Sequence, residues 1–304
     1  MTANPAIPPT YTTMKVAGFT FIRNANIYDY PIVEAITSIL PLCDEFVVAV
    51  GNSEDDTLAL IRNIPTDKIR IIETVWDDSL REGGKVLAQE TDKALAAISP
   101  DVDWAFYIQG DEVMHEKYIP VVKQAMATYL TDSNVEGLLF NYVHFYGSYN
   151  YYGNSRRWYR REIRIVRPFN QVYAYRDAQG FRRSDNKKLK VKLIDAYIYH
   201  YGWVKSLEKI KKKYSYFYRF WHSDEQMNIP QKEAENFQFA KHIDSLALFD
   251  GTHPAVMQER IKRENIQFDF DTRQQNYSTR VKVLAWVERL TGWRIGEYKN
   301  YKLI

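Results

Sequence analysis

The chain has 304 residues, of which 45% are hydrophobic and 26% are charged, a composition that is ordinary for a soluble globular protein. Its single cysteine, Cys43, excludes an intrachain disulfide and a cysteine-based metal cluster, and it favours a reducing compartment. The net charge of +3 conceals an uneven distribution: residues 1–120 carry 9 basic and 19 acidic residues, whereas residues 156–192 carry 13 basic and 3 acidic. The second region is therefore expected to face an anionic ligand or surface.

The first 115 residues are predicted to alternate between strands and helices. Runs of apolar β-formers indicate the strands, and apolar residues at three- and four-residue spacing indicate the helices. The predicted strands are 15–22, 45–50, 68–74 and 103–108, and the helices between them are 31–40, 53–64 and 84–98. This order predicts an α/β fold with a mostly parallel sheet, right-handed crossovers and flanking helices.

The pattern becomes mixed after residue 115. A helix is predicted over 116–130, and β-rich stretches follow over 135–147, 162–168 and 191–203, with a polar, basic loop over 175–188. Further helices are predicted over 205–221, 254–263 and 279–291. The second half is therefore expected to add mixed β structure and then helices to the parallel sheet.

The domain organisation follows from these elements. We expect one compact domain over residues 14–203, with a parallel half over 14–115 and a mixed β half over 116–203. Residues 1–13 are rich in proline and are expected to be a flexible lead-in, and residues 204–304 are expected to be a helical C-terminal extension.

An acidic turn ends the fourth predicted strand, in the stretch YIQGDE at residues 107–112. Ligands bind beyond the carboxyl ends of the strands in open α/β sheets, so Asp111 and Glu112 fall where a site is expected. Asp and Gly are also ordinary turn residues, and a purely structural turn is the alternative.

This arrangement resembles the GT-A glycosyltransferases, and family 2 most closely, over about residues 14–203. The stretch EFVVAVGNSEDDT resembles the family pattern V-D-D-G-S-x-D-x-T, with Ser53, Asp55 and Thr57 matching. The stretch DWAFYIQGDE resembles the DXD turn, where an acidic residue binds a divalent cation on the donor diphosphate. The stretch GGKVLAQETDKAL is similar to the Gly-rich turn and helix that follow the family's third strand.

Two positions depart from the family pattern. Gln109 replaces the first Asp of the DXD turn, and the base-binding Asp after the second strand falls on Val50 or Gly51. Recognition of uridine by that Asp is therefore not carried over to this chain.

The resemblance implies a glycosyltransferase that moves a sugar from a nucleotide-sugar donor to a glycan or lipid-linked acceptor, with inversion and with Mg²⁺ or Mn²⁺ as cofactor. Asp111 is the expected metal ligand, and His200 is either a second ligand or a hydrogen-bonded structural residue. If Gln109 leaves the site poor in metal, basic side chains would stabilise the diphosphate instead. The residues expected to bind the donor are Arg23, Asn24, Asn52, Lys85, Gln109, Asp111, Arg182 and Arg183.

An inverting transfer also requires a base that deprotonates the acceptor hydroxyl. Asp177 and Asp185 lie in the basic loop, where neighbouring cations would keep them ionised, and Asp177 is the first choice. Glu162 and His144 are the alternatives.

The predicted helix over 205–221 combines an aromatic stripe with basic residues, which suits an anionic membrane surface as well as ordinary core packing. Its basic residues are Lys205, Lys209, Lys211, Lys212, Lys213 and Arg219. The N-terminal stretch does not have the pattern of a signal peptide, and no apolar run approaches the length of a membrane span. We therefore expect a cytoplasmic protein, and two alternatives stay open for this helix: attachment to the inner face of the membrane, or core packing alone.

Two other functions remain open. A nucleotidyltransferase could use a similar sheet and acidic turn, but the loop RNANIYDYP after the first strand is not the Gly-rich, basic loop that this reaction normally uses. A non-catalytic protein that binds nucleic acid or glycan could use the basic, aromatic half. No recognised nucleic-acid motif is present, so no nucleic-acid partner is expected.

Overall fold

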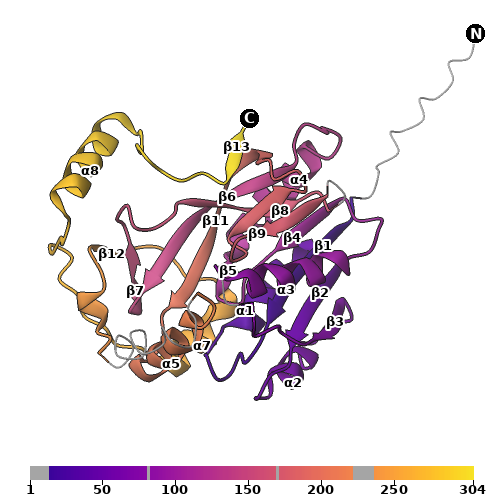
Figure 1. The fold of residues 1–304 in the computed structure, drawn as a ribbon, viewed down its shortest axis with the longest axis horizontal. Coiled ribbons are helices and arrows are strands. Elements are labelled where there is room, and N and C mark those ends of the chain that lie inside the picture. Colours follow the sequence, from indigo (N-terminus) through magenta and orange to yellow (C-terminus); the bar gives the residue numbers. More distant parts are fainter. Residues whose placement is uncertain (1–13, 81–82, 169–170, 222–235) are drawn as a thin grey trace, which may run out of the picture.

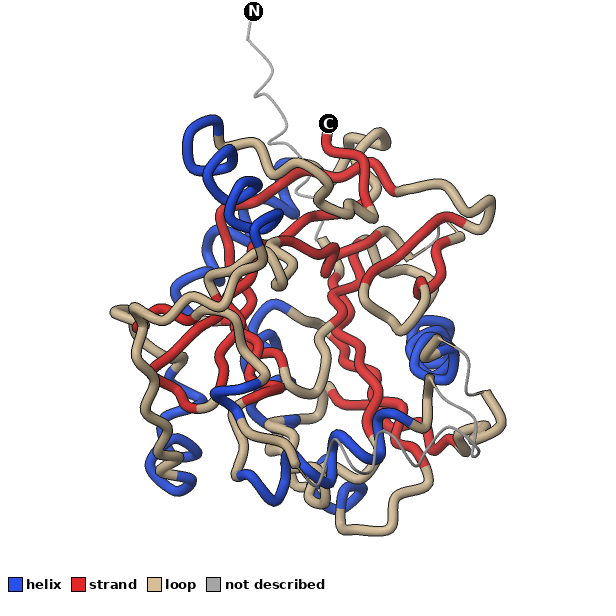
Figure 2. Tube along the Cα trace, turned by 60° about the vertical axis from the view of Figure 1, so that its left-hand side comes forward, coloured by secondary structure: helices blue, strands red, loops and turns tan. Residues whose placement is uncertain are grey.

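The computed structural model describes residues 14–80, 83–168, 171–221 and 236–304. The expected flexible lead-in over 1–13 lies outside the described residues. Figure 1 shows the sheet at the centre of the molecule, and Figure 2 shows strands passing through the middle with helices towards the periphery.

The parallel half follows the predicted order. β1 pairs in parallel with β2 on one side and with β4 on the other, and β3 extends the sheet beyond β2. The strands are β1 (Val16–Ile22), β2 (Glu45–Gly51), β3 (Ile69–Thr74) and β4 (Trp104–Tyr107). The connecting helices are α1 (Ile32–Ile39), α2 (Thr57–Arg62) and α3 (Lys85–Ala96).

The mixed half continues the same sheet in the order β4-β8-β6-β7-β12. The long strand β11 pairs in parallel with β6 and also binds β5 and β13. These strands are β5 (Glu112–Met114), β6 (Gly137–Tyr146), β7 (Ser148–Gly153), β8 (Arg161–Val166), β11 (Leu189–Trp203), β12 (Leu246–Leu248) and β13 (Tyr301–Leu303). The result is a mixed α/β fold with an 11-stranded sheet, which confirms the expected GT-A-like architecture.

Helices cover the sheet and form much of the C-terminal part. They are α4 (Ile119–Thr128), α5 (Leu207–Tyr218), α7 (Gln258–Glu264) and α8 (Thr279–Thr291). The C-terminal part also contributes β12 and β13 to the sheet, which the sequence analysis did not predict. Among the described residues, no helix combines the length and the apolar character needed to cross a bilayer.

The basic stretch 175–188, predicted as a loop, overlaps a two-stranded hairpin. Its strands are β9 (Val172–Tyr175) and β10 (Gly180–Arg183), which pair with Gly180 opposite Tyr175. Arg176 and Ala178 have positive φ angles of 58° and 63°, which tighten the connection. The hairpin is separate from the main sheet, and β9 packs against α3.

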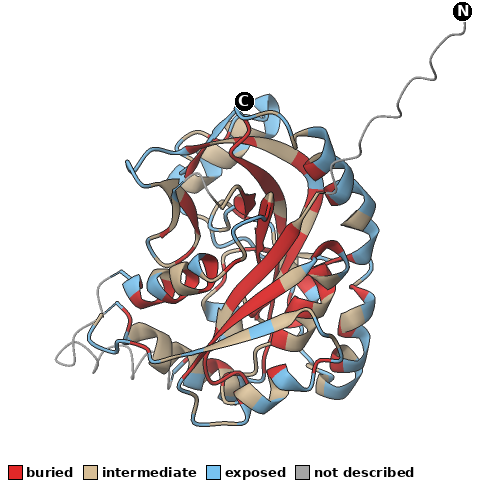
Figure 3. Ribbon diagram, turned by 90° about the vertical axis from the view of Figure 1, so that its right-hand side faces the viewer, coloured by how far each residue is buried: buried red, intermediate tan, exposed pale blue. Residues whose placement is uncertain are grey.

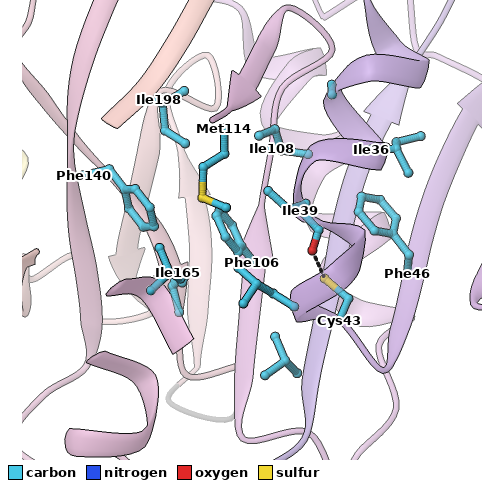
Figure 4. Close-up of a cluster of buried hydrophobic side chains, with 14 of the residues drawn as sticks. Ile36, Ile39, Cys43, Phe46, Phe106, Ile108, Met114, Phe140, Ile165 and Ile198 are labelled. Atoms are coloured by element: carbon cyan, nitrogen blue, oxygen red, sulfur yellow. Dashed lines mark hydrogen bonds between the residues drawn. The ribbon is translucent and has the colours of Figure 1, made fainter. Parts of the chain in front are cut away.

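The core lies on both faces of the sheet. On the α1 side, Ile36, Phe46, Phe106 and Phe140 belong to one buried cluster (Figure 4). On the α3 side, Phe19 belongs to a second cluster. Figure 3 shows that buried residues concentrate in the central strands, which explains why those strands are nearly continuous apolar runs.

Candidate functional site

A cavity of about 700 Å³ lies at the carboxyl ends of β1 and β4. The strand order reverses there, because β2 and β3 lie on one side of β1 and β4 lies on the other. In doubly wound sheets this switch point is where ligands bind, since the loops after the two strands diverge. The cavity is lined by the loop after β1, the acidic turn after β4, the end of β11 and residues of α5.

Asp111 is the carboxylate that the acidic turn contributes to this cavity. Its Oδ2 atom accepts a hydrogen bond from Lys213 Nζ at 3.0 Å and lies 3.7 Å from His200 Nε2. Burial opposes ionisation, but the charges of Lys213 and His200 outweigh it and hold the pKa of Asp111 well below its ordinary value. A Cβ at Gly202 would lie 2.7 Å from both Asp111 Oδ2 and His200 Nε2, so a larger residue there would displace these two side chains.

Glu112, the next residue, faces away from the cavity into the core. Its two carboxylate oxygens accept hydrogen bonds from Arg164 Nε at 2.8 Å and Nη2 at 2.7 Å, and Oε1 also accepts one from the Tyr142 hydroxyl. Both members of this ion pair are fully buried, so losing either would leave an uncompensated charge. Glu112 therefore fixes the turn, and Asp111 is the acidic group of the turn that lines the cavity.

Two histidines lie side by side next to Asp111. His144 on β6 and His200 on the neighbouring strand β11 are opposite each other in the register of the two strands. His144 Nε2 lies 2.8 Å from the carbonyl oxygen of Tyr159 and must donate to it, since a carbonyl only accepts. Burial, with the charge of His200, lowers the pKa of His144 well below its ordinary value, so the ring is neutral. Its Nδ1 then accepts from His200 Nδ1 at 3.2 Å. This directs Nε2 of His200 towards Asp111.

The side chains of Asp111 and His200 suit a divalent cation as ligands. A carboxylate oxygen and an imidazole nitrogen converge, and the second ring nitrogen of His200 is held by a neighbour, as is usual for metal-bound histidines. Within the described part of the chain, no group of three or more His, Cys, Asp or Glu side chains is placed to hold a metal. A cation here would need further ligands from substrate oxygens and water, and it would compete with Lys213 for Asp111 Oδ2.

The residues that match the family pattern after β2 shape the loop after β1. Asp55 Oδ2 accepts from the backbone N–H groups of Asn26 and Ile27 at 2.9 Å each. Thr57 Oγ1 accepts from Ala25 N at 2.7 Å, in a bond that joins the same two segments. Ser53 Oγ likewise accepts from the backbone of the loop after β1. The motif therefore holds the loop that borders the cavity.

Besides Asp111, four of the expected donor-binding residues lie at this edge of the sheet. Arg23 and Gln109 line the cavity, and Gln109 Nε2 donates to Ala178 O at 3.1 Å. The Oδ1 atoms of Asn24 and Asn52 accept backbone hydrogen bonds from nearby residues and so help to shape the rim.

Trp76 was missed by sequence reasoning, although it follows β3 at the same edge of the sheet. A Cβ on Gly51 would lie 2.3 Å from Trp76 Nε1, so the indole fills the place beside the expected base-binding position. Trp76 lines the cavity, and its buried Nε1 has no hydrogen-bond partner among the described residues. It also packs against Phe220 with ring centroids 5.8 Å apart. The cavity therefore has an aromatic surface where the family has an Asp.

The aromatic stripe of α5 faces this cavity. Aromatic residues of α5 and the following turn that line it are Tyr214, Tyr216, Phe217, Tyr218, Phe220 and Trp221. Tyr216 stacks on Tyr28 of the loop after β1 with centroids 4.4 Å apart. Lys205 Nζ donates to Asp29 O, Lys209 Nζ donates to Asn26 O at 3.1 Å, and Lys213 binds Asp111. Three of the six basic residues expected to face a membrane therefore bind the domain.

Asp177 also lines the cavity, next to the Gly-rich turn before α3. A Cβ on Gly84 would lie 2.6 Å from Asp177 Cβ, and Gly84 has a φ of +70°. Glycine is therefore needed at position 84 for both space and backbone conformation. Burial raises the pKa of Asp177 above its ordinary value.

Several predicted residues do not line the cavity. Arg182 binds Asn300 Oδ1 at 2.8 Å, Arg183 pairs with Glu136 at 3.2 Å, and Asp185 pairs with Lys187 at 2.8 Å. The two arginines line a separate surface groove. Lys85 begins α3 and is exposed. Glu162 is buried between strands, and burial raises its pKa to about 8.

A second cavity of about 400 Å³ lies on the other side of the histidine pair. His144 lines it, whereas its hydrogen-bond partner His200 lines the first cavity. The His144 ring stacks on the rings of Trp158 and Tyr142, with centroids 5.1 Å and 5.4 Å away, respectively. The Tyr159 ring meets it edge-on, with a centroid distance of 4.3 Å. Residues of α8 complete the wall. The two cavities therefore meet at the two histidines.

Comparisons with known proteins give partial structural likenesses. No protein-family model matches the sequence, and no curated protein matches it. The structure is similar to glucosyl-3-phosphoglycerate synthase from Mycobacterium tuberculosis, crystallised with Mn²⁺, uridine diphosphate and phosphoglyceric acid, at 21% identity and a TM-score of 0.30, over 43% of this chain and 44% of that chain. It is also similar to S. aureus TarS, at 16% identity and a TM-score of 0.40, over 67% of this chain and 39% of that chain. The activity of this chain has to be inferred from its own residues.

Proposed function

We propose that the protein is a glycosyltransferase that uses a nucleotide-sugar donor. The observation that carries this proposal is the Asp111, Lys213 and His200 cluster in a cavity at the switch point of the sheet. Transfer of a sugar from a nucleotide releases an anionic diphosphate, and a site for it needs cationic groups at the end of the strands. The cluster supplies a lysine directly and offers two ligands for a divalent cation.

The donor would lie along the first cavity. Its base would stack on the aromatic surface formed by Trp76 and Tyr216, because aromatic side chains accept the face of any base. Its diphosphate would lie at Asp111, with Lys213 donating to phosphate oxygens and with Arg23 nearby in the cavity wall. A bound Mg²⁺ or Mn²⁺, held by Asp111 and His200, would supply further charge neutralisation for the leaving diphosphate.

The acceptor would occupy the second cavity, across the histidine pair from the donor. Trp158 and Tyr159 offer aromatic faces of the kind on which sugar rings pack. Arg289 is exposed at this cavity, while Arg156 and Arg160 are paired with Glu288. An exposed arginine beside aromatic rings suits a glycan that carries a negative charge.

Asp177 is the proposed base for an inverting transfer. It lines the donor cavity. Its pKa is raised, so its carboxylate accepts a proton more readily than that of an ordinary surface Asp. Asp185 does not line this cavity, and its ion pair with Lys187 gives it a structural role in the hairpin connection. Attachment to the inner face of a membrane through α5 stays a prediction, with Lys211, Lys212 and Arg219 as the remaining basic residues.

The experiment is a thermal-shift screen of nucleotide sugars with and without Mn²⁺, followed by product analysis of the ligands that bind. A donor that binds the folded state should raise the unfolding midpoint, and turnover should release a nucleoside diphosphate. Release of pyrophosphate would support a nucleotidyltransferase instead. Salt-sensitive oligonucleotide binding without nucleotide-sugar turnover would support a non-catalytic nucleic-acid-binding protein.

A further inference from the structure

The outer face of α8 carries an exposed apolar stripe. Val283, Trp286, Leu290 and Trp293 are 56%, 57%, 61% and 64% exposed, respectively. The spacing of three and four residues places Val283, Trp286 and Leu290 on one face of α8, and Trp293 follows the left-handed Gly292 that ends the helix. Two tryptophans and a leucine exposed together form a patch of the kind that marks an interaction site.

The stripe is not the side of α8 that packs on the protein. Val281, Ala285 and Glu288 line the second cavity, and they lie on the opposite side of the helix from Trp286 and Leu290. Figure 1 shows α8 at the outer edge of the molecule, beyond β7 and β12. No residue of α8 is buried. One face of the helix lines the second cavity, and the opposite face is directed away from the protein.

Basic residues flank the stripe. Arg280 and Lys282 are exposed and form no ion pair within the described part of the chain. The one acidic residue of α8 is Glu288, and its carboxylate is turned inward to Arg156 and Arg160. The outer face of α8 is therefore apolar at its centre and cationic at its margins.

We propose that α8 docks the protein on an anionic lipid surface. Tryptophan is favoured at the level of the lipid headgroups, where its ring is in an apolar medium and its N–H remains near water. Lysine and arginine beside an apolar helical face add attraction to anionic headgroups. A symmetric contact with a second copy would set the cations of the two helices against one another, so the charge pattern favours lipid over self-association.

Docking through α8 also bears on access to the second cavity. The inner face of the same helix lines that cavity, so the cavity would lie within about one helix diameter, roughly 10 Å, of the lipid surface. A glycan attached to a membrane lipid would then have its sugar near the histidine pair. This consequence rests on the proposed glycosyl transfer, whereas lipid docking itself does not.

The test is co-sedimentation of the full chain with vesicles of phosphatidylcholine and phosphatidylglycerol, compared with vesicles of phosphatidylcholine alone. The wild type should bind the anionic vesicles at low salt and lose affinity as salt is raised. The variant Trp286→Gln, Leu290→Gln, Trp293→Gln should bind more than tenfold less tightly. Arg280→Gln with Lys282→Gln should lose affinity for the anionic vesicles only. Lys123→Gln, at an exposed position on α4, is the matched control and should bind like the wild type.

Thermal melting of each variant checks that it folds. A wild type that stays in the supernatant with anionic vesicles overturns the proposal, and so does a folded triple variant that binds them as the wild type does. A dimer in analytical ultracentrifugation that the triple variant abolishes would assign the stripe to a second copy and would also overturn it. Because vesicle binding needs no nucleotide sugar, this result is separate from the fate of the proposed function.

Discussion

Lys213 on α5 donates a hydrogen bond to Asp111 Oδ2 at 3.0 Å, so a helix from the C-terminal part is bound to the acidic turn after β4. A second bond from Lys213 Nζ to Gly202 O at 3.1 Å joins the end of β11 to the same point. The end of β11 and α5, which are neighbours in the sequence, thus meet an acidic turn that lies 102 residues before Lys213. The sequence analysis named Lys213 only among the basic residues that suit a membrane surface, whereas in the structure it binds the acidic turn.

Replacing Lys213 with Met should change both metal binding and activity. The variant removes a cation that competes for Asp111, so we expect tighter Mn²⁺ binding in calorimetry, together with a loss of roughly tenfold or more in turnover as diphosphate stabilisation is lost. Lys212→Met is the matched control, since Lys212 is exposed and pairs with Glu208 on the surface of α5. Unchanged Mn²⁺ affinity in Lys213→Met would show that Lys213 and the metal do not share a ligand.

Glu162→Gln should stabilise the protein at neutral pH. Glu162 has a folded-state pKa of about 8 against an ordinary value of 4.5, so the folded protein keeps it neutral at pH 7 while the unfolded chain ionises it. Wild-type stability should therefore fall as pH rises from about 4.5 to about 8. At about 1.4 kcal/mol per pKa unit, the variant should gain on the order of 3 kcal/mol at pH 7 and nothing at pH 4.

Denaturant unfolding of the wild type and Glu162→Gln from pH 4 to pH 8 measures this difference. Glu259→Gln, at an exposed position on α7, is the control and should change little. Parallel stability curves for the wild type and Glu162→Gln would mean that Glu162 is ionised in the folded protein.

The sequence predicted the parallel half because β1, β2 and β4 are buried on both faces and read as apolar runs. Asp111 was found because the acidic turn directly follows the buried strand β4. A turn at that place puts the Asp111 carboxylate at the edge of the sheet. The period of 3.6 residues likewise identified α5 and α8. These features depend on local sequence alone.

The partners of those elements could not be predicted in the same way. Periodicity identified the stripe of α5 but not the cavity that it faces, and the Lys213 contact joins positions 102 residues apart. Trp76 gave only a weak signal, because the large apolar ring of a Trp after a strand suits a core as well as a site. Ser53, Asp55 and Thr57 matched a family pattern, yet what they do here is hold the loop after β1.

Asp177→Asn tests the proposed base. The substitution removes proton acceptance with little change in shape, so turnover should fall by roughly 100-fold or more while the donor dissociation constant stays within about threefold. Donor binding is measured by calorimetry and turnover by product release. Equal losses in both would make Asp177 a donor-binding or structural residue rather than the base.

Tyr159→Ala tests the acceptor cavity. The Tyr159 side chain is 40% exposed beside His144, whereas its backbone carbonyl, which the histidine uses, is kept in the variant. The acceptor KM should rise roughly tenfold or more, with donor binding unchanged, because an aromatic stacking surface is lost. Tyr298→Ala, at an exposed tyrosine outside the cavity, is the control. A rise in donor KM alone would place the acceptor elsewhere.

Nucleoside diphosphate release from nucleotide sugars by the wild type and by Asp111→Asn tests the central claim most directly. The amide keeps the shape of the side chain but removes the charge that binds Lys213 and a divalent cation. We predict Mn²⁺-dependent release by the wild type and a loss of roughly 100-fold or more in a variant that still melts cooperatively. Turnover by Asp111→Asn close to that of the wild type, or no turnover of any nucleotide sugar by the wild type, would contradict the account.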